Sequence, residues 1–221
     1  MIWSLKFFVF LSVFDKFAKR GTLYFAFGAL NGERLSQGCE SRFSQNVHFV
    51  HRSLFIFTQS SGSQKATNIP FSLVAIMIND WNQELTPWAA PPVFGKVPFG
   101  SGAEKTLEFI TSQLLTKAQG HNTHLILGGY SLAGLFALWA GYQTDKFKGI
   151  TAASPSVWYP QWIDYASENK PLAQSVYLSL GDKEEKAKNP VMSQVGNAIR
   201  KQHDLLMEQD VNTILEWNAG N

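Results

Sequence analysis

One serine lies where an apolar strand would turn sharply into an apolar helix, within residues 128–134 (GGYSLAG). Residues 124–127 (HLIL) predict a buried strand, and residues 132–143 (LAGLFALWAGYQ) have helical spacing. A serine at such a turn, with small residues two positions before and after it, is typical of a nucleophile elbow, G-x-S-x-G. The second small residue here is Ala133 rather than glycine, which the steric requirement still permits. The pattern makes Ser131 the candidate nucleophile.

A serine hydroxyl needs a base to take its proton and an acid to orient that base. Acidic side chains follow the predicted strand 175–180, at Asp182, Glu184 and Glu185. We choose Glu184 as the acid, three residues beyond the glycine that ends the strand, and keep Asp182 as the second choice. For any one of the three, a solvated charged turn is the alternative interpretation.

The five histidines are poorly placed to act as the base. His124 begins the strand that leads to Ser131, so about seven residues at ~3.3 Å each put it ~23 Å from that serine. His121 is farther still, and His203 lies roughly 20 Å along its predicted helix from the active end. His48 and His51 precede the serine in an irregular region and are interpreted as surface residues.

One donor of an oxyanion hole is predictable, namely the backbone N–H of Leu132, directly after the nucleophile. A second donor normally comes from an earlier strand–helix loop. The segment FGALNGER, with Gly28 and Gly32, is a weak candidate for that loop.

Aromatic residues lie in the loops predicted to surround the serine. We expect Tyr130, Trp81, Trp88 and Trp158 to shape a substrate pocket. Packing of long loops against one another is the alternative explanation for each of them.

The chain from residue 67 onward alternates strands with helices, which predicts a mostly parallel sheet with helices on both faces. Besides the strand and helix around the serine, the expected strands are 71–78, 149–153, 175–180 and 211–217, and the expected helices are 102–119, 161–167 and 190–209. Residues 79–99 carry four prolines and predict a long ordered loop at the active edge.

Residues 1–66 differ in composition from residues 67–221. They hold eleven of the 17 phenylalanines and eight Lys and Arg against three Asp and Glu, a balance of 8 − 3 = +5. The remainder has eleven against fourteen, a balance of 11 − 14 = −3. Residues 1–66 lack clear turn signals between strands and helices, so we assign no elements to them. We therefore expect the sheet to have an open edge there. The apolar stretch 2–14 is too short to span a bilayer.

Composition excludes several classes of function. A net charge of +2 in 221 residues gives no reason to invoke nucleic acid. The single cysteine, Cys39, excludes a disulfide framework and a cysteine-based metal site, and it fits a cytoplasmic location. No phosphate-binding glycine loop or metal-ligand cluster is visible, so we expect no metal and no cofactor. A membrane association is not expected, and the oligomeric state stays open.

Several ordered segments resemble one family: 71–96, GGYSLAGLFALWA (128–140), SPSVWYP (154–160), LGDKEEKAKNPVM (180–192) and ILEWNAGN (214–221). Through them the chain resembles bacterial α/β-hydrolases of the esterase family related to esterase D and the enterochelin-type esterases, over residues 67–221. The resemblance implies a small-molecule ester substrate, a nucleophile at Ser131 and an acid in the segment GDKEE.

Two sequence elements of the family have no counterpart in this chain. The family has its histidine directly after the E-W-N-x-G-N element, where the chain ends at Asn221, and an opening strand with an oxyanion loop ahead of residue 67. The expected fold is therefore an α/β-hydrolase core, truncated before the catalytic histidine and incomplete at both ends. Two alternatives stay open, a non-catalytic or fragmentary hydrolase-like protein without turnover, and an acyl transferase that uses the same triad.

Overall fold

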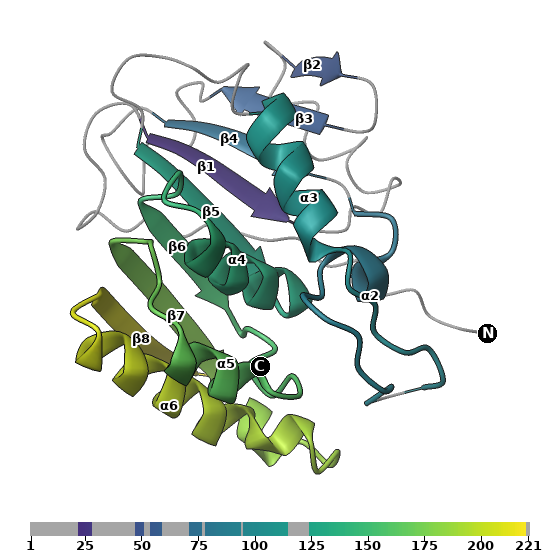
Figure 1. Ribbon diagram of the computed structural model, residues 1–221, viewed down its shortest axis with the longest axis vertical. Helices are drawn as coiled ribbons and strands as arrows, with labels where there is room; N and C mark the ends of the chain where they lie inside the picture. The colour runs from purple at the N-terminus through teal and green to yellow at the C-terminus, as the bar shows by residue number, and fades with distance from the viewer. Residues whose placement is uncertain are drawn as a thin grey trace.

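An eight-stranded sheet organises the chain (Figure 1). The computed structural model describes residues 22–27, 47–50, 54–58, 71–76, 78–93, 95–114 and 124–219. The strand order is β2-β3-β4-β1-β5-β6-β7-β8. Strand β3 is antiparallel to both of its neighbours, and every other neighbouring pair is parallel. The bounds are β1 (Thr22–Phe27), β2 (Val47–Val50), β3 (Leu54–Thr58), β4 (Phe71–Ile76), β5 (His124–Tyr130), β6 (Gly149–Ala153), β7 (Ser175–Gly181) and β8 (Asn212–Asn218).

Helices connect the parallel strands, and α3 to α6 lie in front of the sheet in Figure 1. Their bounds are α2 (Trp81–Glu84), α3 (Ala103–Phe109), which continues as the π-helical turn η1 (Ile110–Leu114), α4 (Leu132–Gln143), α5 (Trp162–Glu168) and α6 (Val195–Glu208). Two 3₁₀ turns, η3 (Glu184–Lys186) and η4 (Met192–Gln194), precede α6. No helix in the described part of the chain combines the length and the apolar character that crossing a membrane would require.

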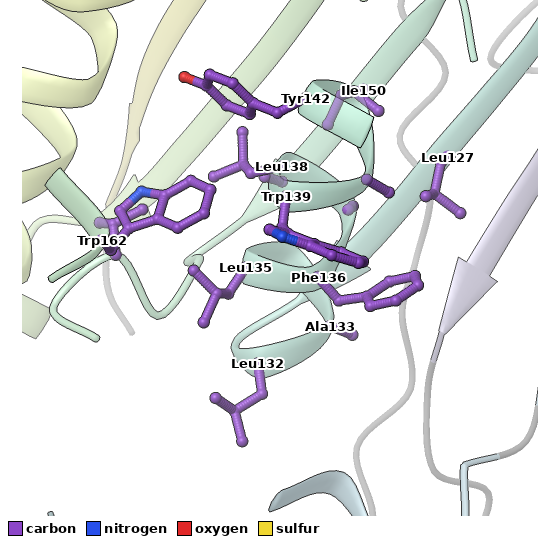
Figure 2. Packing of buried hydrophobic residues seen from close by; sticks show 14 of the residues in the cluster. Leu127, Leu132, Ala133, Leu135, Phe136, Leu138, Trp139, Tyr142, Ile150 and Trp162 are labelled. Atoms are coloured by element: carbon purple, nitrogen blue, oxygen red, sulfur yellow. The ribbon is translucent and has the colours of Figure 1, made fainter. Parts of the chain in front are cut away.

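Helix α4 forms the centre of the core. Residues 132–142 are all buried, because the helix is apolar on every side and packs on β5 and β6 with α5 and α6 beyond it. Figure 2 shows its side chains directed to both sides, with Trp162 of α5 on one side and Leu127 of β5 on the other. The ring of Tyr142 meets that of Trp162 edge-on at 5.9 Å. The helix is therefore enclosed, which fixes the position of its first turn.

The predicted elements from residue 124 onward agree closely with the structure. The helix 132–143 and the strand 149–153 have the predicted bounds, β7 is one residue longer than predicted, and β8 is shifted by one residue at both ends. The expected helix 190–209 begins later than predicted, because residues 192–194 form a 3₁₀ turn before α6. The expected helix 102–119 is α3 followed by η1 as far as residue 114.

The expectation of an open sheet edge ahead of residue 67 is wrong. Strands β1, β2 and β3 all come from the first 66 residues, and β1 lies between β4 and β5. Their sequences, TLYFAF, VHFV and LFIFT, are rich in aromatic and branched residues that favour strands. The turn residues that would have marked their ends were not recognisable. The boundary between residues 66 and 67 lies outside the described residues and stays a prediction, as do helices on the second face.

A buried hydrogen-bond chain ties three helices together. The indole Nε1–H of Trp162 donates to Oε1 of Gln202 at 2.8 Å, and Nε2–H of Gln202 donates to the hydroxyl of Tyr142 at 3.1 Å. Gln202 is fully buried, so its amide has no water to replace these partners. Burial raises the pKa of Tyr142 to about 12, which keeps its hydroxyl neutral.

Replacing Gln202 with methionine should lower the free energy of unfolding by about 2 kcal/mol, because the side chains of Trp162 and Tyr142 lose their amide partner inside the core. The measurement is urea unfolding followed by far-UV circular dichroism. The neighbouring exposed residue gives a matched control, since Lys201→Met should change stability by less than about 0.5 kcal/mol. Equal effects of the two substitutions would show that the buried chain contributes nothing.

Candidate active site

Ser131 occupies the sharp turn between β5 and α4. Its backbone has φ 57° and ψ −121°, a strained conformation for a residue with a side chain. Its N–H donates to the carbonyl of Ala153 at 3.1 Å, and its carbonyl accepts the N–H of Leu135 at 3.0 Å. The strand–turn–helix geometry predicted around the serine is therefore present, and the hydroxyl lies at the carboxyl edge of the sheet.

The turn depends on a close approach of two backbones at Gly129. A Cβ at this position would lie 2.2 Å from the carbonyl oxygen of Ala133 and 2.8 Å from its methyl group. A Cβ at Gly134 would in turn lie 3.1 Å from Cα of Pro155, in the loop that follows β6. Small residues are thus required on both sides of Ser131 because the strand, the helix and the next loop meet there.

The loop of Ser154, Pro155 and Ser156 covers the turn. The N–H of Ser156 donates to the carbonyl of Ser131 at 3.1 Å, and the two hydroxyl oxygens lie 3.3 Å apart. Ser156 is only 2% exposed, so its contact with the hydroxyl of Ser131 is shielded from water. The candidate nucleophile is held through both its backbone and its side chain by the same neighbour.

Glu184 is the acidic side chain that reaches this loop. Its Oε1 accepts a hydrogen bond from Oγ of Ser154 at 2.5 Å and another from the N–H of Gly181 at 3.0 Å. Ser154 itself has φ 42°, and its N–H donates to the carbonyl of Ser179 at 2.7 Å. One oxygen of the Glu184 carboxylate, Oε1, is therefore held by two hydrogen bonds.

The other two acidic candidates have different surroundings. Glu185 forms an ion pair of 2.9 Å with Arg200, whose guanidinium lies 4.6 Å from the ring centre of Trp217. Asp182 is exposed, and its N–H donates to the carbonyl of Asn218 on β8 at 3.0 Å. Of the three, Glu184 is the one whose carboxylate is hydrogen-bonded to the loop that covers Ser131.

Tyr130 lies beside the acid. Burial raises the pKa of its phenol, the negative charge of Glu184 raises it further, and a hydrogen bond with the side chain of Ser154 lowers it. The phenol therefore shares the surroundings of Ser154 and Glu184, whereas the sequence predicted it for a substrate pocket. A pocket role for Tyr130 stays a prediction.

The three tryptophans predicted for the pocket pack partly against the core. The indole N–H of Trp88 donates to the carbonyl of Pro160 at 2.9 Å, and its ring stacks at 6.4 Å on that of Trp162. Trp158 lies against Phe99, with 6.2 Å between the ring centres. Trp81 is the first residue of α2 and is half-buried. Each has packing partners, and their contribution to a pocket stays a prediction.

His124 and His203 lie away from the carboxyl edge of the sheet, and His48, which was expected in an irregular region, lies on β2, at the far side of the sheet from β5. His124 is the first residue of β5, at the opposite end of the strand from the turn. His203 lies eight residues beyond Val195, about 12 Å along α6, and its Nδ1 is 3.7 Å from Oδ1 of Asp204. Within the described ranges no group of three or more His, Cys, Asp and Glu side chains could hold a metal ion.

One of the two predicted oxyanion donors, the N–H of Leu132, directly follows Ser131 in the structure. Leu132 is the first residue of α4, so its N–H is one of the amides for which an α-helix supplies no internal acceptor. Strand β1 ends at Phe27, in register with Gly129 on β5. Gly28 and Gly32, the weak candidates for the second donor, lie outside the described residues.

Known proteins resemble this chain in their folds but not in their sequences. No family model and no curated protein sequence matches this chain. Among solved structures, siderophore hydrolase EstB from Aspergillus nidulans is 16% identical with a TM-score of 0.58, covering 92% of this chain and 77% of that one. Siderophore hydrolase EstA from the same organism is 18% identical with a TM-score of 0.52, covering 91% and 75%.

An IroE-like serine hydrolase from Shewanella oneidensis is 15% identical with a TM-score of 0.60, and 91% of this chain covers 64% of that one. The chain thus has the α/β-hydrolase fold, which it shares with these siderophore and serine hydrolases. The fold-level resemblance inferred from the motifs is confirmed.

Sequence reasoning missed two residues of the site, Ser154 and Ser156. They were assigned only to the loop after the strand 149–153. Because β6 is parallel to β5 and pairs with it, the end of β6 had to emerge beside Ser131. That adjacency was the signal that could have identified both serines.

Replacing Gly129 with alanine should lower the free energy of unfolding by about 3 kcal/mol or more, because the methyl group would overlap the carbonyl of Ala133. Gly95 is a control, since its Cβ position has no atom within 4 Å. Gly95→Ala should cost about 1 kcal/mol, from its positive φ alone. Chemical denaturation measures both variants, and a Gly129→Ala variant as stable as Gly95→Ala would contradict the close approach.

Proposed function

We propose that the protein is a serine-dependent carboxylic-ester hydrolase acting on a small-molecule ester. The observation that carries the proposal is the position of Ser131 on a strained turn, with Glu184 held by the loop that also covers that serine. A serine and an orienting acid at neighbouring strand ends are the arrangement that nucleophilic acyl transfer needs. The esterase neighbours of the fold agree with this chemistry.

Ser131 Oγ attacks the ester carbonyl while a general base takes its proton. The oxygen of the tetrahedral intermediate accepts a hydrogen bond from the N–H of Leu132. The intermediate collapses to an acyl-serine, and the alcohol leaves with the proton from the base. Water then attacks the acyl group through the same base, which releases the carboxylic acid and the free serine.

The family resemblance places the general base, a histidine, directly after the E-W-N-x-G-N element at the end of β8. Two observations support this position. Asn218 on β8 pairs with Gly181 on β7, so the end of β8 emerges beside the strand end that precedes Glu184. Oε1 of Glu184 already accepts two hydrogen bonds, which leaves Oε2 to accept the N–H of an imidazole.

A non-catalytic hydrolase-like protein is the second candidate. His124 lies at the opposite end of β5 from Ser131. His203 lies eight residues beyond the start of α6. A chain whose serine has no base would keep the fold without turnover. The experiment below separates the two functions because free imidazole can replace a missing base.

A fluorophosphonate probe should label this chain at Ser131, and added imidazole should accelerate the labelling about tenfold or more, because it supplies a general base. Mass spectrometry locates the adduct, and the labelling rate is measured against imidazole concentration. Ser131→Ala should abolish labelling. Ser193→Ala should not change it, since Ser193 lies on an exposed turn where its hydroxyl donates to the carbonyl of Pro190. Absence of labelling with imidazole present would favour the non-catalytic protein.

A further inference from the structure

The loop of residues 154–156 contacts both halves of the proposed site. At one end Ser156 holds Ser131 through a backbone bond of 3.1 Å and a hydroxyl contact of 3.3 Å. At the other end Ser154 donates to Oε1 of Glu184 at 2.5 Å. Between them Pro155 packs against Gly134 in the first turn of α4. One short loop therefore connects the serine and the acid.

Ser154 is held for this contact at a cost in backbone energy. Its φ of 42° lies in the left-handed region, which a residue with a Cβ adopts only when its surroundings impose it. The bond from its N–H to the carbonyl of Ser179, at 2.7 Å, fixes that conformation against β7. This backbone conformation directs the hydroxyl of Ser154 toward Glu184.

The hydroxyl of Ser154 has one proton, and Glu184 accepts it. Tyr130 lies near both groups, since the charge of Glu184 raises the pKa of its phenol and the side chain of Ser154 lowers that pKa. The bond that joins the loop to the acid is the one from Oγ of Ser154 to Oε1 of Glu184.

We propose that Ser154 is a positioning residue for the catalytic acid. Together with the N–H of Gly181 it fixes Oε1 of Glu184, so that Oε2 faces the imidazole of the base. This inference rests on the proposed function and assigns to Ser154 the orientation of the acid relative to Ser131. Ser154 touches neither substrate nor reacting atoms.

Two substitutions separate the hydroxyl of Ser154 from its backbone conformation. Ser154→Ala removes the hydroxyl and keeps the strain, whereas Ser154→Gly removes the hydroxyl and relieves the strain. Both should lower the acceleration of Ser131 phosphonylation by imidazole about tenfold, measured as the ratio of the rates with and without imidazole. A Ser154→Gly variant with the wild-type dependence on imidazole would overturn the proposal, because the hydroxyl of Ser154 would then not be needed.

Asp210 provides a matched control. It is another residue with a side chain at positive φ, 59°, and it lies between α6 and the amino end of β8, away from the site. Asp210→Gly should leave both rates unchanged and should stabilise the fold by relief of the same kind of strain. It therefore tests whether relief of strain alone alters the chemistry.

The titration of Tyr130 tests the side-chain contact without any reaction. The charge of Glu184 raises the pKa of Tyr130, so Glu184→Gln should lower it, and the bond with Ser154 lowers that pKa, so Ser154→Ala should raise it. Carbon-13 NMR of labelled tyrosine measures both shifts, and Tyr130→Phe identifies the signal. If neither variant moves the pKa, the proposal is overturned. If both do so but Ser131 is never labelled, the proposed function fails while the contact between Ser154 and Glu184 stands.

Discussion

The contact of β5 with α4 at Gly129 is the constraint on which the site depends. A backbone carbonyl of the helix occupies the space where a side chain would be, so the chain turns from strand to helix within one residue. Ser131 can keep its strained backbone because α4 is buried from end to end and cannot shift. The free energy of the core thus stabilises a conformation that the local sequence would not adopt alone.

Parallel pairing brings the remaining parts of the site to one edge. Strands β5, β6 and β7 are neighbours, and Ser131, Ser154 and Glu184 follow their carboxyl ends in turn. Neighbouring strands are about 4.8 Å apart, so a serine and an acid two strands apart need a bridge. The hydroxyls of the loop after β6 occupy that gap, which explains how an acid on one strand end can be oriented relative to a serine on another.

The fold by itself does not determine which substrate is bound. Hydrolases with this fold share the sheet and the turn, while their loops differ, and those loops carry specificity. In this protein the loop with Trp88 is tied to the loop with Pro160 by a hydrogen bond, and Asn189 is tied to Val93 by another of 2.9 Å. The loops that carry these four residues are therefore fixed to one another by hydrogen bonds.

The sequence by itself determined the elements near the serine. Apolar runs bounded by glycines predicted β5, α4 and β6, and the small residues around Ser131 predicted the turn, because such patterns express local steric and burial requirements. The tertiary structure alone decided the rest. Spacing in the sequence favoured Glu184 over Asp182 and Glu185, but only the tertiary structure brings the carboxylate of Glu184 to Ser154. Strand β1 likewise depends on β4 and β5, partners distant in the chain, since an apolar segment pairs according to its neighbours in space.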